Sequence, residues 1–294
     1  MKNDIADLAR CYRINNGKKF RLKDCATDQT GGFTKEFAAG ILEESIATLS
    51  ALQEKLFAQS EWSVLLIFQA MDAAGKDATI KHVLTGVNPQ GCHVSAFKAP
   101  SAEELNHDFL WRASRCLPER GQIGVFNRSY YEEALVVRVH PDYLKNQKLP
   151  EKCLTKRIWD ERFESINDFE RHITRNGTVV LKFFLHLSPG EQKKRLRERL
   201  DEKERNYKFK IGDLTERKLW SRYMDAYEDA LQHTSTKHAS WHVVPADHKW
   251  FSHLVVSAVV IDALQNLKLH FPPLDAEAKK NLATARAELG TTKK

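Results

Sequence analysis

The stretch SVLLIFQAMDAAGKDATIKHV, residues Ser63–Val83, decides the fold that we predict for this chain. An apolar run, Val64–Phe68, leads into a turn of small residues that ends at Gly75, and Lys76 follows directly. Beyond the lysine, apolar side chains recur at helical spacing: Ile80, Val83, Leu84 and Val87. A strand, a tight turn, a lysine and a helix in this order are typical of a phosphate-binding loop. In such a loop, backbone N–H groups and the start of the helix face an anion.

The loop AMDAAGK keeps the spacing of the G-x-x-x-x-G-K motif but departs from it twice. Ala70 replaces the first glycine, and Asp77 replaces the Ser or Thr whose hydroxyl normally meets magnesium. Asp72 can supply a ligand instead, because a carboxylate is a hard oxygen donor, and it can also orient or deprotonate an attacking phosphate oxygen. The plainer interpretation of the loop is a strand-to-helix turn that happens to contain Gly-Lys. The plainer interpretation of Asp72 is an aspartate that only stabilises its own turn.

The rest of the chain predicts strands and helices in alternation. Strands are expected near residues 64, 92, 122, 178 and 241, and Thr178–Leu187 is the most apolar of them. Helical crossovers between such strands give a parallel sheet with helices on both faces. We therefore expect an α/β fold with three layers in a single domain that covers residues 1–294.

Periodicity and capping residues predict the individual helices. Four long helices are expected: Lys35–Ala58, Glu151–Arg175, Asp213–His238 and Trp250–Leu267. Ser101–Glu104 is a capping box that predicts a further helix as far as Cys116. We interpret residues 1–35 as an extended arm, either solvated or in contact with an anion, ahead of a helix that ends near residue 60. The tail after Pro273 is expected to be disordered.

Charge and cysteine content narrow the class of protein. Lys and Arg number 46 against 39 Asp and Glu, a net charge of +7 that favours anionic partners without requiring nucleic acid. The five cysteines are widely spaced and include no CxxC pair, which argues against a disulfide framework or a structural zinc site. The N-terminus lacks the apolar core of a signal peptide, and no apolar stretch is long enough to span a bilayer. We expect a cytoplasmic protein.

Two further segments carry candidate binding residues. Asn127 and Arg128 follow a short apolar strand, and the carboxyl ends of parallel strands line the ligand crevice of an open sheet. Arg128 can hold a phosphate with its planar guanidinium, unless it forms only a surface salt bridge. Asn127 stands where a carboxylate is expected, and Glu132 and Glu133 can compensate for it.

The basic helix at 193–199 and the segment at 207–210 suggest a lid over phosphates at about 195–215. A solvated basic face explains most of these charges equally well.

Several phrases together resemble the polyphosphate kinase 2 family, in the family's order and over nearly the whole chain. They include FQAMDAAGKDATIKHV, IGVFNRSYYEEALVVRVHP, FFLHLSPGEQKKRLRERL and WHVVPADHKW. The resemblance implies a P-loop kinase core, similar to that of thymidylate kinase, with a helical lid. It also implies reversible phosphoryl transfer between inorganic polyphosphate and nucleotides, with Mg²⁺ or Mn²⁺ as cofactor.

The resemblance also implies roles for individual residues. Asp72 and Lys76 match the loop carboxylate and lysine of the family, with Asp72 as the metal ligand. Asn127 and Arg128 match its second motif, and Arg199 matches its lid arginine. Contacts to phosphate or nucleotide are expected for a further set: Ala73, Ala74, Gly75, Asp77, Lys81, Glu132 and Lys208. Tyr207 stands where the family usually has Trp.

The form Asn-Arg-Ser-Tyr resembles the subgroup that phosphorylates nucleoside mono- and diphosphates. AMP and ADP are the expected acceptors, with GMP and GDP as further candidates, and the family tends to form dimers or tetramers. No contact with nucleic acid or membrane is expected.

Two alternative functions remain open from the sequence. One is a nucleoside-phosphate kinase that uses ATP as donor, and the other is a non-catalytic protein that binds polyanions or RNA. A GTPase is disfavoured because the sequence has no N-K-x-D motif.

Overall fold

The structure, a computed structural model, describes residues 5–290. Its centre is a five-stranded sheet in the order β2-β3-β1-β4-β5, and all four pairings are parallel. The strands are β1 (Ser63–Ala70), β2 (Cys92–Ala96), β3 (Ile123–Asn127), β4 (Thr178–His186) and β5 (Trp241–Pro245). Each predicted strand is present, which confirms the expected α/β fold with a central parallel sheet.

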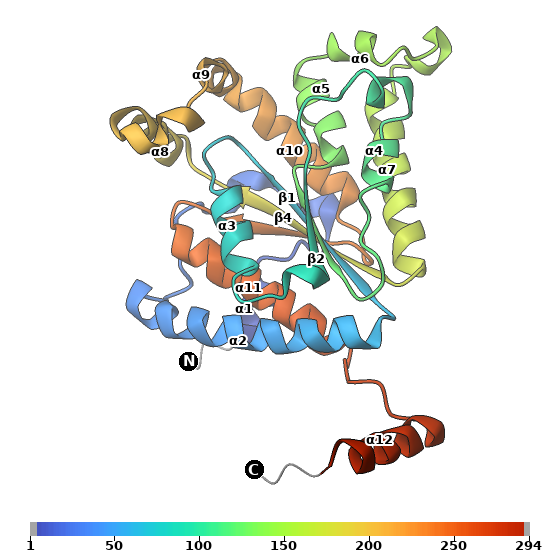
Figure 1. Cartoon of the computed structure of the whole chain (residues 1–294). Coiled ribbons are helices and arrows are strands. Elements are labelled where there is room, and N and C mark those ends of the chain that lie inside the picture. The colour runs from blue at the N-terminus through green and yellow to red at the C-terminus, as the bar shows by residue number, and fades with distance from the viewer. Residues whose placement is uncertain (1–4, 291–294) are drawn as a thin grey trace.

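Helices cover both faces of this sheet (Figure 1). One face carries α1 (Ile5–Cys11), α2 (Lys35–Gln59), α3 (Lys76–Val83) and α11 (Lys249–Asn266). The other face carries mainly α7 (Ile158–Arg175) and α10 (Trp220–Thr234). Strand β1 contributes alternate side chains to the two cores, with Phe68 on the first face and Ile67 on the second. Because β1 is buried on both sides, its residues are apolar almost without interruption.

Shorter elements complete the chain. The remaining α-helices are α4 (Trp111–Ser114), α5 (Val136–Val139), α6 (Tyr143–Asn146), α8 (Pro189–Asp201), α9 (Ile211–Lys218) and α12 (Ala276–Leu289). Residues 5–290 also form seven 3₁₀ turns: η1 (Gly17–Lys19), η2 (Leu22–Asp24), η3 (Pro89–Gly91), η4 (Glu104–Asn106), η5 (Tyr130–Glu133), η6 (Glu151–Cys153) and η7 (Lys203–Lys208). Helices α8 and α9, with η7 between them, project beyond the sheet where a lid was expected (Figure 1).

The helix predicted from Ser101 to Cys116 is wrong, although its capping box forms. The Ser101 N–H donates to the Glu104 carboxylate at 2.6 Å, and the Glu104 N–H donates to the Ser101 hydroxyl at 3.2 Å. The chain then makes only the turn η4 before α4 begins. The Asp108 side chain accepts from the Leu110 N–H at 2.9 Å, a local bond that competes with a continuous helix.

Two other predicted helices are shorter than expected. Helix α7 begins at Ile158 rather than Glu151, because the Thr155 hydroxyl accepts the Arg157 N–H at 3.0 Å and ends the preceding loop. The helix predicted over Asp213–His238 is two helices, α9 and α10, which are separated at Leu219.

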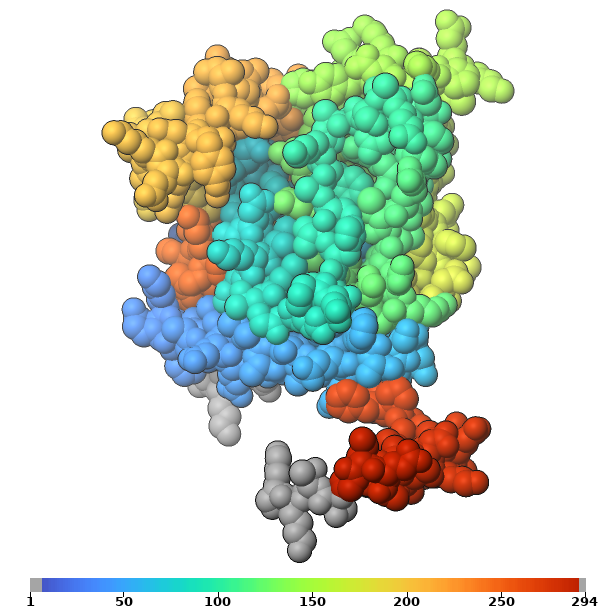
Figure 2. Space-filling view, viewed as in Figure 1, coloured from blue at the N-terminus to red at the C-terminus, as the bar shows by residue number. Residues whose placement is uncertain are grey.

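Both ends of the described chain differ from prediction. The arm is not simply extended, because α1 packs on α11 with Leu8 buried. The Ile14 N–H then donates to the Trp241 carbonyl at 2.8 Å, so the arm lies along β5. The tail after Pro273 contains α12, which starts at an Asp275 cap and stands apart from the body with none of its residues buried (Figure 2). The predictions for residues 1–4 and 291–294 lie outside the described residues.

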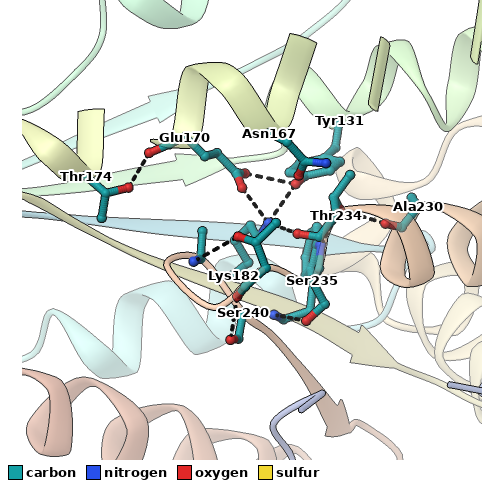
Figure 3. Close-up of polar contacts among 12 residues, drawn as sticks. Tyr131, Asn167, Glu170, Thr174, Lys182, Ala230, Thr234, Ser235 and Ser240 are labelled. Atoms are coloured by element: carbon teal, nitrogen blue, oxygen red, sulfur yellow. Dashed lines mark hydrogen bonds and ion pairs between the residues drawn. The ribbon is translucent and has the colours of Figure 1, made fainter. Parts of the chain in front are cut away.

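A buried ion pair crosses the second core between β4 and α7 (Figure 3). Lys182 and Glu170 have fully buried side chains, with Nζ and Oε2 2.6 Å apart. The ammonium group also donates to the Tyr131 hydroxyl at 2.8 Å and to the Thr234 carbonyl at 2.7 Å. The pair therefore ties four elements together: β4, α7, η5 and α10.

The described residues bear on two further predictions. All five cysteines are free, which agrees with the absence of a disulfide framework. Within residues 5–290, no helix has both the length and the apolarity needed to cross a membrane.

Candidate active site

The turn between β1 and α3 has the geometry of a phosphate loop. Gly75 caps α3 with a φ of 104°, a backbone conformation that favours glycine, and Ala73 adopts a φ of 64°. The Lys76 ammonium folds back over the turn and donates to the Ala70 carbonyl at 2.9 Å. Burial, together with the nearby Arg128 charge, lowers the pKa of Lys76 to about 8. A bound anion would offset the desolvation free energy of keeping this buried amine charged.

Arg128 lies beside the loop because β3 is the neighbour of β1 in the sheet. Its guanidinium bonds two carboxylates, with Nη2 3.0 Å from Asp72 Oδ1 and Nη1 3.0 Å from Glu132 Oε2. The Gln69 side chain donates to the other Glu132 oxygen at 2.8 Å. Glu132 raises the pKa of Arg128 more than any other group, with Asp72 adding to it. Arg128 also has a φ of 64°, an uncommon backbone conformation that often marks functional sites.

Asn127 reaches the start of α3. Its Nδ2 donates to Asp77 Oδ1 at 2.8 Å, so two of the positions at which the sequence departs from the usual motifs contact each other. The register of the sheet, with Phe68 opposite Asn127, brings them together.

A cavity of about 470 Å³ opens next to the loop, a volume suited to a small-molecule ligand. Asp72, Arg128 and Glu132 are charged residues in its wall. Other lining residues come from the helices and loops around it: Lys98, Leu105, Arg112, Val136, Val137, Tyr143, Lys210, Asp213, Tyr223 and Tyr227. The wall combines charge that suits phosphates with apolar and aromatic surface that suits a base.

Some predicted site residues lie outside this wall. Lys81 is exposed on α3, and Lys208 is exposed on η7. The Arg199 guanidinium is 3.2 Å from the Asp213 carboxylate and 3.5 Å from the carbonyl of Lys208. Burial raises the pKa of Asp213, with the Asp72 charge adding to the effect. In this structure Lys210 lines the cavity and Lys208 does not.

The sequence did not single out several residues that the structure brings to the site. Gln192 and Arg195 of α8 are buried and bond the backbone of the loop. Tyr223 and Tyr227 of α10 also line the cavity. The one available clue for α8 was the spacing of Gln192, Arg195 and Leu196, which places them on one face of the helix.

The residues around the loop suit a hard divalent cation. Mg²⁺ is usually held by one or two carboxylates together with substrate phosphates, rather than by a complete protein cage. Within the described residues, no group of three or more potential ligands forms such a cage. Asp72 bonds Arg128 through Oδ1 only, so Oδ2 has no protein partner among the described residues. This set of donors fits a metal whose remaining ligands come from phosphates.

The parallel sheet, the glycine-lysine loop and the polar strand ends define a P-loop kinase-like protein. A family model described as Polyphosphate kinase 2 matches residues 34–272. The chain belongs to this polyphosphate kinase 2 family, as the sequence phrases implied. Kinases of the family generally need a divalent metal.

Individual relatives agree with this assignment. The chain is 49% identical over 280 residues to an ADP-polyphosphate phosphotransferase of Rhodopseudomonas palustris, which covers 95% of this chain and 97% of the relative. It is 41% identical over 271 residues to an AMP/ADP-polyphosphate phosphotransferase of Meiothermus ruber, covering 92% and 97%. A crystal structure of Polyphosphate Kinase 2 from Arthrobacter aurescens matches with a TM-score of 0.85 at 40% identity, covering 95% of this chain and 96% of that one.

Proposed function

We propose that this chain transfers phosphoryl groups reversibly between inorganic polyphosphate and nucleotides, with AMP and ADP as acceptors and Mg²⁺ or Mn²⁺ as cofactor. The observation that carries the proposal is the cluster of Asp72, Arg128 and Glu132, which joins the phosphate loop to the wall of the cavity. The cavity gives the nucleotide a place beside the loop. The names of the relatives support polyphosphate as the other substrate.

The transfer forms one bond and breaks one. A terminal phosphate oxygen of the acceptor bonds to the end phosphorus of polyphosphate, and the bond from that phosphorus to the bridging oxygen breaks. The polyphosphate, shorter by one unit, leaves with the electron pair. The acceptor oxygen is already anionic at neutral pH, so positioning and charge stabilisation supply most of the catalysis.

Each site residue has a proposed part in this step. Lys76 and the loop amides of Ala73 and Gly75 hold phosphate oxygens, beside Asp77 at the start of α3 and Asn127 at the end of β3. Arg128 stabilises negative charge on the transferring group, and Arg199 joins it if the lid segment releases Asp213. When bound, a magnesium ion held by Asp72 and by phosphate oxygens supplies further positive charge. Asp72 itself stays oriented by its bond to Arg128.

A donor-swap assay tests the function. Purified protein receives ADP or AMP, Mg²⁺ and polyphosphate without ATP, and nucleotide products are separated by chromatography. We expect ATP from ADP and ADP from AMP. Product that appears only when ATP is the donor would favour an ordinary nucleoside-phosphate kinase. No turnover with either donor, together with polyphosphate binding that Asp72→Asn leaves unchanged, would favour a non-catalytic polyanion-binding protein.

Three finer statements belong to the same proposal. We propose that the chain works as a single domain, in the cytoplasm, and as a homodimer or homotetramer. The five free cysteines are consistent with a reducing compartment. Light scattering coupled to gel filtration measures the oligomeric state. A monomeric mass would contradict the proposed homodimer or homotetramer.

A further inference from the structure

Helix α8 holds the backbone of the phosphate loop through three successive carbonyls. Gln192 Nε2 donates to the Asp72 carbonyl at 3.0 Å. Arg195 Nη1 donates to the carbonyls of Ala73 at 3.2 Å and Ala74 at 2.9 Å. Gln192 is 1% exposed and Arg195 is 4% exposed, so neither contact competes with bulk water. The back of the loop is therefore fixed to a helix outside the motif itself.

Arg195 uses all of its donors within the protein. Its Nε donates to Glu191 at 2.9 Å, and its Nη2 donates to the carbonyls of Ala246 at 2.7 Å and Asp247 at 3.0 Å. With the two loop carbonyls these are five acceptors, and a guanidinium has five N–H groups. No donor remains for a substrate phosphate. Although Arg195 lies in the basic helix that the sequence suggested as a phosphate lid, its contacts are with the backbone.

The direction of the carbonyls decides where the loop amides point. In a trans peptide unit the C=O and the N–H point in opposite directions, and the described residues contain no cis peptide. Holding the carbonyls of residues 72–74 toward α8 therefore turns the N–H groups of residues 73–75 away from it. Among the described hydrogen bonds, the N–H groups of Ala73 and Gly75 have no protein acceptor, whereas that of Ala74 donates to the Met71 carbonyl at 3.3 Å. Two free N–H groups remain for an anion.

We propose that Gln192 and Arg195 are positioning residues, which orient the free amides of Ala73 and Gly75 toward the bound phosphate. The identity of that phosphate as polyphosphate rests on the proposed function. The positive φ of Ala73 is a conformation that needs such external support. Helix α9 connects to the same point, because Arg217 Nη1 donates to Gln192 Oε1 at 2.7 Å. Helix α9 and the loop thus both bond the side chain of Gln192.

Two substitutions at Arg195 separate positioning from direct charge. Lysine keeps the positive charge but has three donors at one atom, so it cannot span the carbonyls of the loop and of Ala246. We expect Arg195→Lys and Arg195→Met to lower kcat/KM for polyphosphate to a similar degree, by about 100-fold, as for the loss of a preorganised donor set. If Arg195→Lys keeps activity within about threefold of the wild type while Arg195→Met loses it, the charge is what matters and the positioning role is wrong.

Gln192→Met tests the second contact and has a matched control. Gln53 is an equally buried glutamine on α2, where its Oε1 accepts the Asn88 N–H at 3.3 Å outside the site. Both Gln→Met substitutions remove a buried amide, and we expect both to lower the thermal midpoint. Only Gln192→Met should lower kcat/KM of the folded enzyme, by about tenfold, as expected for the loss of its one hydrogen bond to the loop. Equal effects of the two variants on kcat/KM would overturn the proposal.

The loop amides give a readout that does not depend on turnover. In ¹⁵N-labelled protein, tripolyphosphate should shift the amide resonances of Ala73 and Gly75, and both Arg195→Lys and Gln192→Met should reduce those shifts at equal ligand. Shifts of wild-type size in folded variants, or none in the wild type, would contradict the proposal. If the wild type shows the shifts and the variants lose them, yet polyphosphate supports no transfer, the proposed function fails while the positioning role stands.

Discussion

The side-chain amide of Asn127 donates a hydrogen bond to the carboxylate of Asp77 across the end of the sheet, with Nδ2 and Oδ1 2.8 Å apart. In the usual motifs a carboxylate stands at the strand end and a hydroxyl at the helix start. Here an amide and a carboxylate occupy these places, so the negative charge has moved from β3 to α3. An aspartate in the first turn of a helix is also favoured by the helix dipole. The two departures therefore compensate each other.

This relationship predicts the behaviour of the exchanged pair. Asn127→Asp places two carboxylates in contact, and we expect a loss of about 1–4 kcal/mol in the free energy of unfolding without divalent metal. Mg²⁺ should recover part of that loss. The double variant Asn127→Asp/Asp77→Asn carries the same charge in exchanged positions and should be more stable than the single variant. Urea unfolding with and without Mg²⁺ measures all three proteins, and a double variant no better than the single one would contradict the compensation.

Lys76 predicts a pH dependence of activity. Its pKa is lowered to about 8, mainly by burial, so the free enzyme loses this charge as pH rises through that value. We expect kcat/KM for polyphosphate to fall above about pH 8. Lys76→Arg should move the fall in kcat/KM to higher pH, because arginine stays charged.

Lys76→Ala should abolish phosphoryl transfer while the circular dichroism spectrum stays unchanged. A fully active Lys76→Ala variant would remove the loop from the mechanism.

The same lysine affects stability in the opposite direction. The folded pKa of about 8 lies below the ordinary value of 10.5, so between these values the unfolded chain holds a proton that the folded chain has released. The contribution of Lys76 to the free energy of unfolding therefore rises with pH across this window. Comparing the wild type with Lys76→Met from pH 7 to pH 10 isolates this contribution, and a difference that does not change with pH would refute the lowered pKa.

Arg128 should contribute as much to kcat as any other charged residue of the site. Arg128→Ala removes the bridge between Asp72 and Glu132 and leaves two carboxylates without their shared cation. We expect kcat to fall by about 10²- to 10³-fold, as for the loss of one preorganised donor. Arg157→Ala, at an exposed arginine of similar ion pairing outside the cavity, serves as the control and should be neutral. An Arg128→Ala variant within about threefold of the wild type would be inconsistent with the proposed role.

The buried pair Lys182–Glu170 predicts a large effect on stability. Burial lowers the pKa of Lys182 while Glu170 raises it, so the carboxylate offsets part of the cost of burying the ammonium group. Lys182→Met alone leaves Glu170 buried without its cation and should cost about 3–5 kcal/mol in the free energy of unfolding. The double variant Lys182→Met/Glu170→Leu should recover much of that loss, because it buries neither charge. For comparison, Lys145→Met breaks an exposed pair with Asp142 and should leave the free energy of unfolding nearly unchanged, because water screens that pair.

Local patterns explain what the sequence could predict. The strand-loop-helix unit around Lys76 and the strand end at Asn127 follow from apolar runs and motif spacing, which depend on neighbouring residues. The contact of Arg195 with the loop could not be predicted, because the spacing places Arg195 on the same helix face as Leu196 but does not show which backbone groups that face meets. Lys182 did leave a trace, as a lone lysine in the apolar strand TVVLKFFLHL, since such a residue is rarely buried unless paired.

The register in which β4 pairs with its neighbouring strands depends on Lys182. Slipping this strand by one residue would turn Lys182 to the opposite face of the sheet, away from Glu170, and would bring an apolar neighbour, Leu181 or Phe183, against the carboxylate. Misaligned sheets therefore carry an unpaired buried charge, which correct pairing avoids. Because β4 leads directly into α8, the same alignment decides how far along the loop Gln192 arrives. We expect a charge deep in the core to set, to within one residue, the place at which a helix meets the loop.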